Sequence, residues 1–262
     1  MAKYCRRKIY SGRVLECVSR PVSARVKIGK ADLEKPPRHD IDRVGHLMGI
    51  SKRRMTRTIN SNFSNDAYFV TLTFDNEHYD DTYATAYAIF RKFCRKLKRI
   101  NPDYKAVWVY GRGRKNKRIH IHMIISGVAV EKIMSKWTWG DIVDVEPLSE
   151  SNYDHVTGEC YGQDYRALAA YMFRHWTSEQ EGTQYYHVTR NLESPFMDEP
   201  EEIDDDAYNS KPDVPPDYVL VDYYCNTYGC KIHRYVFMPP DYSDEPPLPF
   251  LPPLPGGLAP LD

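Results

Sequence analysis

Two histidines, His120 and His122, and one tyrosine, Tyr171, have the residue types and spacing to act on a phosphodiester. The segment RIHIHMII, residues 118–125, alternates, so both imidazoles share one strand face while three isoleucines and a methionine fill the other. Neutral imidazoles two residues apart can bind one divalent ion, which could polarise a phosphodiester. Tyr171 lies in an apparent helix and offers a hydroxyl nucleophile. Its attack would leave a 5′-phosphotyrosine and a free 3′-hydroxyl.

Arg174 and His175 follow Tyr171 and complete the candidate catalytic set. Arginine keeps its proton, so Arg174 can hold a phosphate but cannot act as an acid. His175, four residues after the tyrosine, is a candidate base. Tyr165 is an alternative nucleophile, but six residues of helix turn it away from Tyr171.

Charge is unequal along the chain, although its formal net charge is zero. Residues 1–139 contain 30 Lys and Arg against 12 Asp and Glu, whereas residues 140–262 contain 6 against 24. So basic a block favours a polyanionic partner. The cations nearest the histidines are the candidate DNA-binding residues Arg112, Arg114, Lys115, Lys117 and Arg118.

The elements that must position these residues follow from the hydrophobic periodicity. Four segments have strand patterns: residues 67–74, 104–110, 118–125 and 141–148. Three have helical patterns: residues 82–100, 130–137 and 164–176. The first six elements in chain order read β-α-β-β-α-β, which predicts an α+β fold with a ferredoxin-like, or RRM-like, antiparallel sheet. Both helices would cover one face, the histidines would lie mid-sheet on the other, and the Tyr171 helix would be an addition.

The rest of the chain has weaker patterns. We expect a basic, irregular N-terminal extension at residues 1–50, the chemistry-bearing domain at 51–195, an acidic linker at 196–216, a tyrosine-rich β-hairpin at 217–238 and a proline-rich disordered tail at 239–262. Truncation after about Pro195 should then leave the chemistry intact. The sequence has neither a signal-peptide pattern nor a membrane-span pattern, and its six cysteines form no C-x-x-C pair, so we expect a cytosolic protein with mostly free thiols.

Three segments resemble the motifs of a known superfamily. FVTLTF, HIHMII and AAYMFRHW, in this order, look like motifs one, two and three of HUH replication initiators. Within that superfamily, the chain is similar to the rolling-circle replication-associated proteins of small single-stranded DNA phages and plasmids, the group of filamentous-phage and microvirus initiators. NFSNDAYFVTLTF, WTWG and VTRNLESP add to this likeness, which covers about residues 50–195.

The resemblance implies a site-specific DNA endonuclease and strand transferase. By position, His120 and His122 would bind Mn²⁺ or Mg²⁺ and Tyr171 would be the nicking residue. The protein would nick single-stranded origin DNA, stay covalently joined to the 5′ end and free a 3′-hydroxyl for rolling-circle replication. Its expected location is the cytoplasm of a bacterial host, without a membrane partner. Because the sequence has no Walker A loop, a host helicase and a host DNA polymerase are implied partners.

Two positions depart from the family pattern. Members of the family usually carry a glutamate, as third metal ligand, on the strand before the histidine strand, where this chain reads VYGRG with Gly111. The alternatives for that ligand are Asp75, Glu77, His78, Asp144, Glu146 and water. Arg174 stands where the family has a lysine.

Two other functions remain open. A non-catalytic nucleic-acid-binding module with a ferredoxin-like fold would use the open sheet face without cleavage. A 2H phosphoesterase would use paired His-x-Thr triplets, which occur at His155–Thr157 and His187–Thr189. The first triplet lies in a sequence typical of a loop, which disfavours this enzyme.

Overall fold

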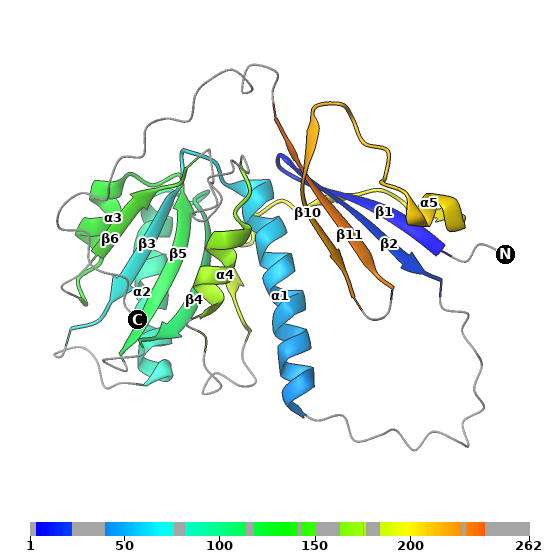
Figure 1. The fold of residues 1–262 in the computed structure, drawn as a ribbon. Helices are drawn as coiled ribbons and strands as arrows, with labels where there is room; N and C mark the ends of the chain where they lie inside the picture. The colour runs from blue at the N-terminus through cyan, green and yellow to red at the C-terminus, as the bar shows by residue number, and fades with distance from the viewer. Residues whose placement is uncertain are drawn as a thin grey trace, which may run out of the picture. The chain divides into compact units, whose positions relative to one another are not determined.

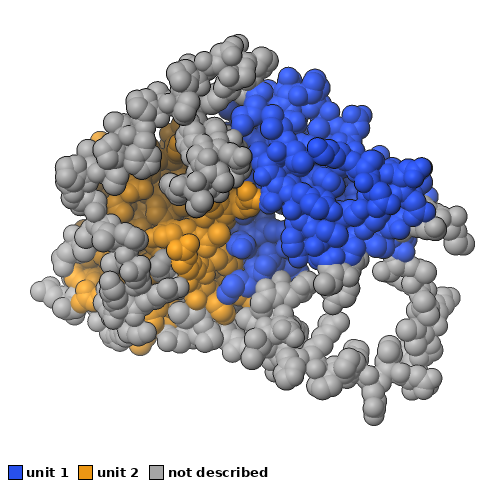
Figure 2. Space-filling model, viewed as in Figure 1, with its two compact units in different colours: residues 1–61, 151–164, 194–240 blue, residues 62–150, 165–193, 241–262 orange. Residues whose placement is uncertain are grey.

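The computed structural model describes residues 4–22, 40–75, 82–113, 118–140, 143–149, 163–174, 176, 184–226 and 229–238. The chain divides into two units, which Figure 2 colours separately. Unit 1 combines residues 1–61, 151–164 and 194–240, and unit 2 combines residues 62–150, 165–193 and 241–262. No helix in the described ranges is both long and apolar enough to cross a membrane.

Unit 2 contains an antiparallel sheet with the strand order β6-β3-β5-β4-β7 (Figure 1). The strands are β3 (Tyr68–Thr73), β4 (Lys105–Arg112), β5 (Ile119–Ser126), β6 (Val143–Pro147) and β7 (His187–Val188). The helices are α2 (Tyr83–Ile100), α3 (Val130–Lys136) and α4 (Arg166–Arg174). The α+β class is confirmed, β3 to β6 with α2 and α3 follow the predicted element order, and β3 and β5 are the expected central neighbours.

Helices α2 and α3 cover one face of this sheet because the apolar residues of strands and helices face each other there. Helix α2 begins after Thr82, whose hydroxyl accepts a hydrogen bond from the Thr85 backbone N–H at 3.2 Å. Its stripe packs on alternate residues of β5, and the shared core includes Phe90, Phe93, Leu97, Ile119, Ile121, Met123 and Ile125. The other face of β5 is left for α4.

Unit 1 contains a second antiparallel sheet, ordered β10-β11-β2-β1-β8, with β9 also paired to β1. Its strands are β1 (Tyr4–Ser11), β2 (Val14–Pro21), β8 (Phe196–Met197), β9 (Glu201–Ile203), β10 (Tyr218–Cys225) and β11 (Lys231–Phe237). Helix α1 runs Asp40–Asn62 and α5 runs Asp205–Asn209.

The ends of the chain are more ordered than the sequence suggested. Residues 4–21, expected to be irregular, form the β1–β2 hairpin, because Ile9, Val14 and Leu15 supply a core that the many charges obscured. Its turn needs Gly12, which has a φ of 55° and whose added Cβ would lie 2.0 Å from the Asn60 carbonyl oxygen of α1.

The predicted acidic linker, residues 196–216, contains β8, β9 and α5. Strand β9 pairs with the basic strand β1, and Glu201 lies opposite Arg6. The acidic composition therefore complements a basic strand. The predicted 217–238 hairpin is present as β10 and β11, but β11 also pairs with β2. Truncation after Pro195 would thus remove four strands of this sheet. The proline-rich tail, residues 239–262, lies outside the described residues.

Buried ion pairs join three segments of unit 1. Arg234 donates to both Asp164 carboxylate oxygens, at 2.8 and 2.7 Å, and also to Glu16. Arg57 of α1 donates to Glu16 at 2.5 Å. The side chains of Glu16, Asp164 and Arg234 are 7% exposed or less, so each charge depends on its partners.

Candidate active site on the open sheet face

His120 and His122 lie side by side on β5, with ring centroids 4.6 Å apart and exposures of 9% and 2%. The strand register puts Thr73 of β3 beside His120 and Thr71 beside His122. The Thr71 hydroxyl is 3.1 Å from Nδ1 of His122. This hydrogen bond orients the ring and favours Nε2 as its metal-binding atom.

Phe69 is a further neighbour of the histidines that the sequence argument did not name. Its ring stacks on His122 with a centroid distance of 5.5 Å and an interplanar angle of 20°. Phe69 and Thr71 alternate along β3, so the period-two pattern of FVTLTF already placed both residues on one face. That pattern was the signal that could have identified them.

Helix α4 brings Tyr171 to this face. The Tyr171 ring centroid is 5.2 Å from that of His122, and the ring meets Phe69 edge-on at 6.0 Å. Tyr171 is 37% exposed, whereas Tyr165 is 1% exposed and donates its hydroxyl to the Ser149 carbonyl oxygen at 3.3 Å. Of these two tyrosines, only Tyr171 combines proximity to the histidines with access to a substrate.

The surroundings of Tyr171 act on its pKa in both directions. Partial burial raises the pKa of its hydroxyl, and the carboxylates Asp144 and Glu146 raise it further. The Arg174 guanidinium lowers it, and its carbon atom lies 5.8 Å from the Tyr171 ring centroid. The balance is a raised pKa, so the phenol must lose its proton to a base before or during attack. His175, the candidate base, lies outside the described residues.

Gly111 lies directly opposite His120, on the strand where the family glutamate was expected. The acids nearest the histidines in register are on the other side, on β6. Asp144 lies across β3 from His122, with Thr71 between them, and Glu146 lies opposite Phe69. Burial, followed by the Asp144 charge, raises the pKa of Glu146. Among the residues that the structure describes, no three His, Cys, Asp or Glu side chains converge as a metal-binding group.

The other proposed third ligands are placed as follows. Asp75 follows β3, and its backbone N–H donates to the Trp139 carbonyl oxygen at 2.9 Å. Glu77 and His78 lie outside the described residues. The donor set present on the face is therefore two imidazoles, which suit a divalent transition metal whose remaining positions are filled by water or substrate oxygens.

The WTWG segment, residues 137–140, holds the end of β3. Trp137 donates its indole N–H to the Thr73 carbonyl oxygen at 3.0 Å. Gly140 approaches the same carbonyl so closely that an added Cβ would lie 1.7 Å from its oxygen. Since Thr73 pairs with His120, this contact positions one edge of the histidine face.

The predicted DNA-binding cations are divided by the structure. Arg112 belongs with Tyr110 and Trp108 to the helix-covered face of β4, and its guanidinium lies 5.5 Å from the Tyr83 ring centroid of α2. Arg118 immediately precedes β5, on the histidine side of the alternation, and donates to the Phe74 carbonyl oxygen at 3.4 Å. Arg114, Lys115 and Lys117 lie outside the described residues.

The histidine of the second His-x-Thr triplet is remote from the candidate site. His187 of β7 stacks on Trp108 with a centroid distance of 5.6 Å, on the face that α2 covers. Burial lowers the pKa of His187. The first triplet, His155–Thr157, lies outside the described residues, so the paired arrangement of a 2H phosphoesterase stays a prediction.

Unit 2 is thus an antiparallel α+β unit with two histidines and a tyrosine on one sheet face. Residues 67–180 match the family model for Replication-associated protein ORF2/gene 2 protein. The match runs from the start of β3 past α4 and includes His120, His122 and Tyr171. It supports a replication initiator family and a role in DNA replication. No curated protein and no solved structure matches the chain.

Proposed function

We propose that this protein is an HUH endonuclease and strand transferase that initiates rolling-circle replication. It nicks single-stranded origin DNA with Tyr171 as nucleophile. The observation that carries the proposal is the 5.2 Å approach of the Tyr171 and His122 rings on one sheet face, within the segment matched by the replication-associated family. A tyrosine and a histidine pair brought together from distant parts of the chain are the two components that such a reaction needs.

The reaction follows from the groups on this face. Oη of Tyr171 attacks the scissile phosphorus as the phenol loses its proton, a bond to phosphorus forms, and the bond to the 3′ oxygen breaks. The 3′ oxygen takes up a proton, and the 5′ phosphate remains esterified to the tyrosine. Arg174, close to the Tyr171 ring, binds the phosphate oxygens, and His175 accepts the phenolic proton.

His120 and His122 would hold a divalent metal, Mn²⁺ or Mg²⁺. When bound, such an ion supplies a positive charge that makes the phosphate a better electrophile. Asp144 is the candidate replacement for the missing glutamate, because its register aligns it with Thr71 and His122. The protein's own contribution is orientation: Thr71 and Phe69 fix the His122 ring, and α4 fixes Tyr171.

The partners of this reaction are single-stranded origin DNA, a host helicase and a host DNA polymerase in the bacterial cytoplasm. The alternative is a non-catalytic nucleic-acid-binding module, and Gly111 in place of the glutamate is the observation that favours it. An assay with end-labelled origin DNA separates the two functions. We expect Mn²⁺-dependent cleavage that a chelator stops; stoichiometric DNA binding without cleavage in Mn²⁺ or Mg²⁺ would establish the binding module instead.

A further inference from the structure

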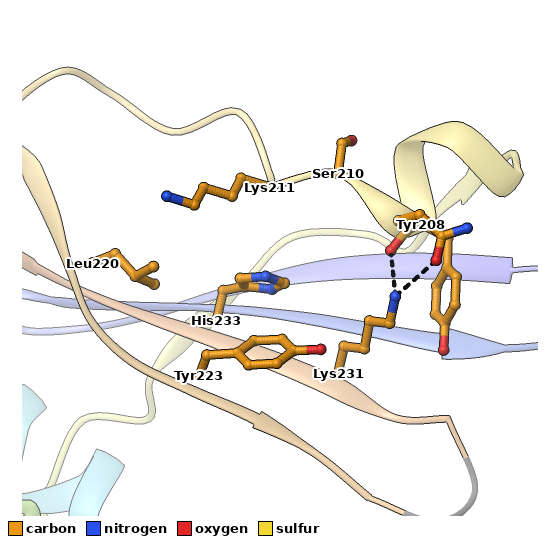
Figure 3. A pocket seen from close by; sticks show the side chains of 8 residues that line it. Tyr208, Ser210, Lys211, Leu220, Tyr223, Lys231 and His233 are labelled. Carbon is orange, nitrogen blue, oxygen red and sulfur yellow. Dashed lines mark hydrogen bonds between the residues drawn. The ribbon is translucent and has the colours of Figure 1, made fainter.

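Unit 1 contains a pocket on the sheet face opposite the Arg234 ion pairs. Its volume is about 320 Å³, and it lies between the end of α5 and the β10–β11 hairpin. Figure 3 shows Lys211 reaching from the loop after α5, while Tyr223, Lys231 and His233 come from the two strands. The volume is within the usual range of small-molecule sites, which is about 300–1,000 Å³.

The pocket is cationic although it belongs to the acidic half of the chain. Residues 140–262 contain six Lys and Arg, and two of these, Lys211 and Lys231, line it. Lys231 is engaged by the protein, because its ammonium donates to the Tyr208 carbonyl oxygen at 3.1 Å and to Asn209 at 3.0 Å. Lys211 is exposed, and within the described part of the chain neither lysine has a carboxylate partner.

His233 lies at the floor of the pocket. It is 7% exposed, and its Nδ1 has no hydrogen-bond partner among the described residues. Burial lowers the pKa of its imidazole, and the charges of Arg6, Lys231 and Lys211 lower it further. Three cations therefore converge on a neutral ring, an arrangement that a bound anion would relieve.

The rim of the pocket supplies an aromatic surface. Tyr223 is 50% exposed, and its ring centroid is 4.7 Å from that of His233. The next residue, Tyr224, is similarly exposed at 54% but points to the opposite side of β10, since side chains alternate along a strand. Cations beside an exposed aromatic ring are the combination by which proteins bind single strands, with bases stacked and phosphates neutralised.

We propose that this pocket is an accessory site for one nucleotide of single-stranded DNA. Lys211 and the Nδ1 side of His233 bind the phosphate, and the base stacks on the Tyr223 ring. The identity of the polymer rests on the proposed replication function, but the pocket is built entirely within unit 1. It would hold a strand at a point separate from the nicking residues.

The test uses the full chain and a 12-residue oligothymidylate with 5-iododeoxyuridine substitutions, in the absence of divalent metal. Irradiation followed by peptide mapping is expected to find a crosslink at Tyr223. Crosslinks confined to other tyrosines, including Tyr224, would overturn the proposal.

Affinities of the same oligonucleotide, measured by fluorescence anisotropy, provide matched controls. Tyr223→Ala should weaken binding about fivefold to tenfold, as expected for one lost base stack, whereas Tyr223→Phe and Tyr224→Ala should stay within about twofold. Lys211→Gln should weaken binding about threefold and reduce the salt dependence by about one ion. Equal losses for Tyr223→Ala and Tyr224→Ala, or no effect of Lys211→Gln, would contradict the site.

The two proposals fail separately. Tyr171→Phe should still crosslink at Tyr223, and Tyr223→Ala should still cleave saturating origin DNA in Mn²⁺. A crosslink at Tyr223 without any cleavage by the unaltered protein would keep the accessory site and reject the nicking function. Cleavage without the crosslink would do the reverse.

Discussion

At the residue scale, the candidate site depends on how firmly His122 is held. Three neighbours from two other elements contact it: the Thr71 hydroxyl, the Phe69 ring and the Tyr171 ring. The alternation of RIHIHMII predicted the shared face of the histidines. The approach of Tyr171 could not be derived from periodicity, because it depends on where α4 crosses the sheet.

Replacing His120 or His122 by alanine is expected to abolish metal-dependent nicking. Affinity for single-stranded DNA should remain largely intact, because the cationic surface supplies most of that affinity. Mn²⁺ should support the unaltered protein at least as well as Mg²⁺, since imidazole is a softer ligand than carboxylate. Nicking and anisotropy assays on the same preparations check this. Full cleavage by the double variant would remove the histidines from the mechanism.

The pH dependence of nicking should report the charges around Tyr171. The raised pKa of its hydroxyl predicts a single-turnover rate that increases with pH above neutrality, as the phenol loses its proton more readily. Arg174 lowers this pKa, so Arg174→Gln should move the rising limb to higher pH. Glu146 raises it, so Glu146→Gln should move the limb to lower pH.

Rates measured from about pH 6 to about pH 10 separate this electrostatic effect from a loss of phosphate binding, because the midpoint is compared and not the maximal rate. Shifts of both variants in the same direction would show that these charges do not govern the phenol.

At the element scale, the strands and helices of unit 2 were largely predictable. Residues 82–100 show the apolar stripe of α2, and 67–74 shows the alternation of β3, so local pattern and final structure agree. The role of WTWG was not predictable, since its contacts with Thr73 and Asp75 join residues about 60 positions apart.

Gly140→Ala tests the contact between WTWG and β3. The added methyl group would collide with the Thr73 carbonyl oxygen, so we expect unit 2 to lose about 1–3 kcal/mol of stability and nicking to fall with it. Gly49→Ala is the matched control: Gly49 lies within α1 with no atom within 4 Å of an added Cβ, so the change should stabilise the protein by about 0.4–1 kcal/mol. Urea unfolding measures both. Equal stabilities for the two variants would exclude the proposed contact.

At the scale of the whole molecule, unit 1 was missed because its sheet is assembled from the two ends of the chain. Strand β2 pairs with β11, more than 200 residues later, and no periodicity signals such a pairing. The acidic segment 196–216 was assigned as a linker from composition alone, although Tyr208 within it is buried and stacks on Tyr4 at 3.9 Å.

Arg234→Met tests whether the C-terminal hairpin is an integral part of unit 1. The change would leave Glu16 and Asp164 buried without their shared cation, and such a loss typically costs about 3–5 kcal/mol. Arg54→Met, at an exposed position of α1, should change stability by less than about 0.5 kcal/mol. Hydrogen exchange of β2 and β11 amides in both variants gives the comparison. A small effect of Arg234→Met would mean that the ion pairs contribute little to the unit.

The identity of the nucleophile is the central claim, and peptide mapping of a covalent protein–DNA adduct tests it most directly. The protein is incubated with labelled single-stranded origin DNA and Mn²⁺, digested, and the modified residue is identified. We predict that the DNA is on Tyr171, that Tyr171→Phe binds DNA but forms no adduct, and that Tyr165→Phe still forms one, because Tyr165 is buried against Ser149. DNA attached to Tyr165, Tyr161 or any other residue, or an adduct formed by Tyr171→Phe, would contradict the account.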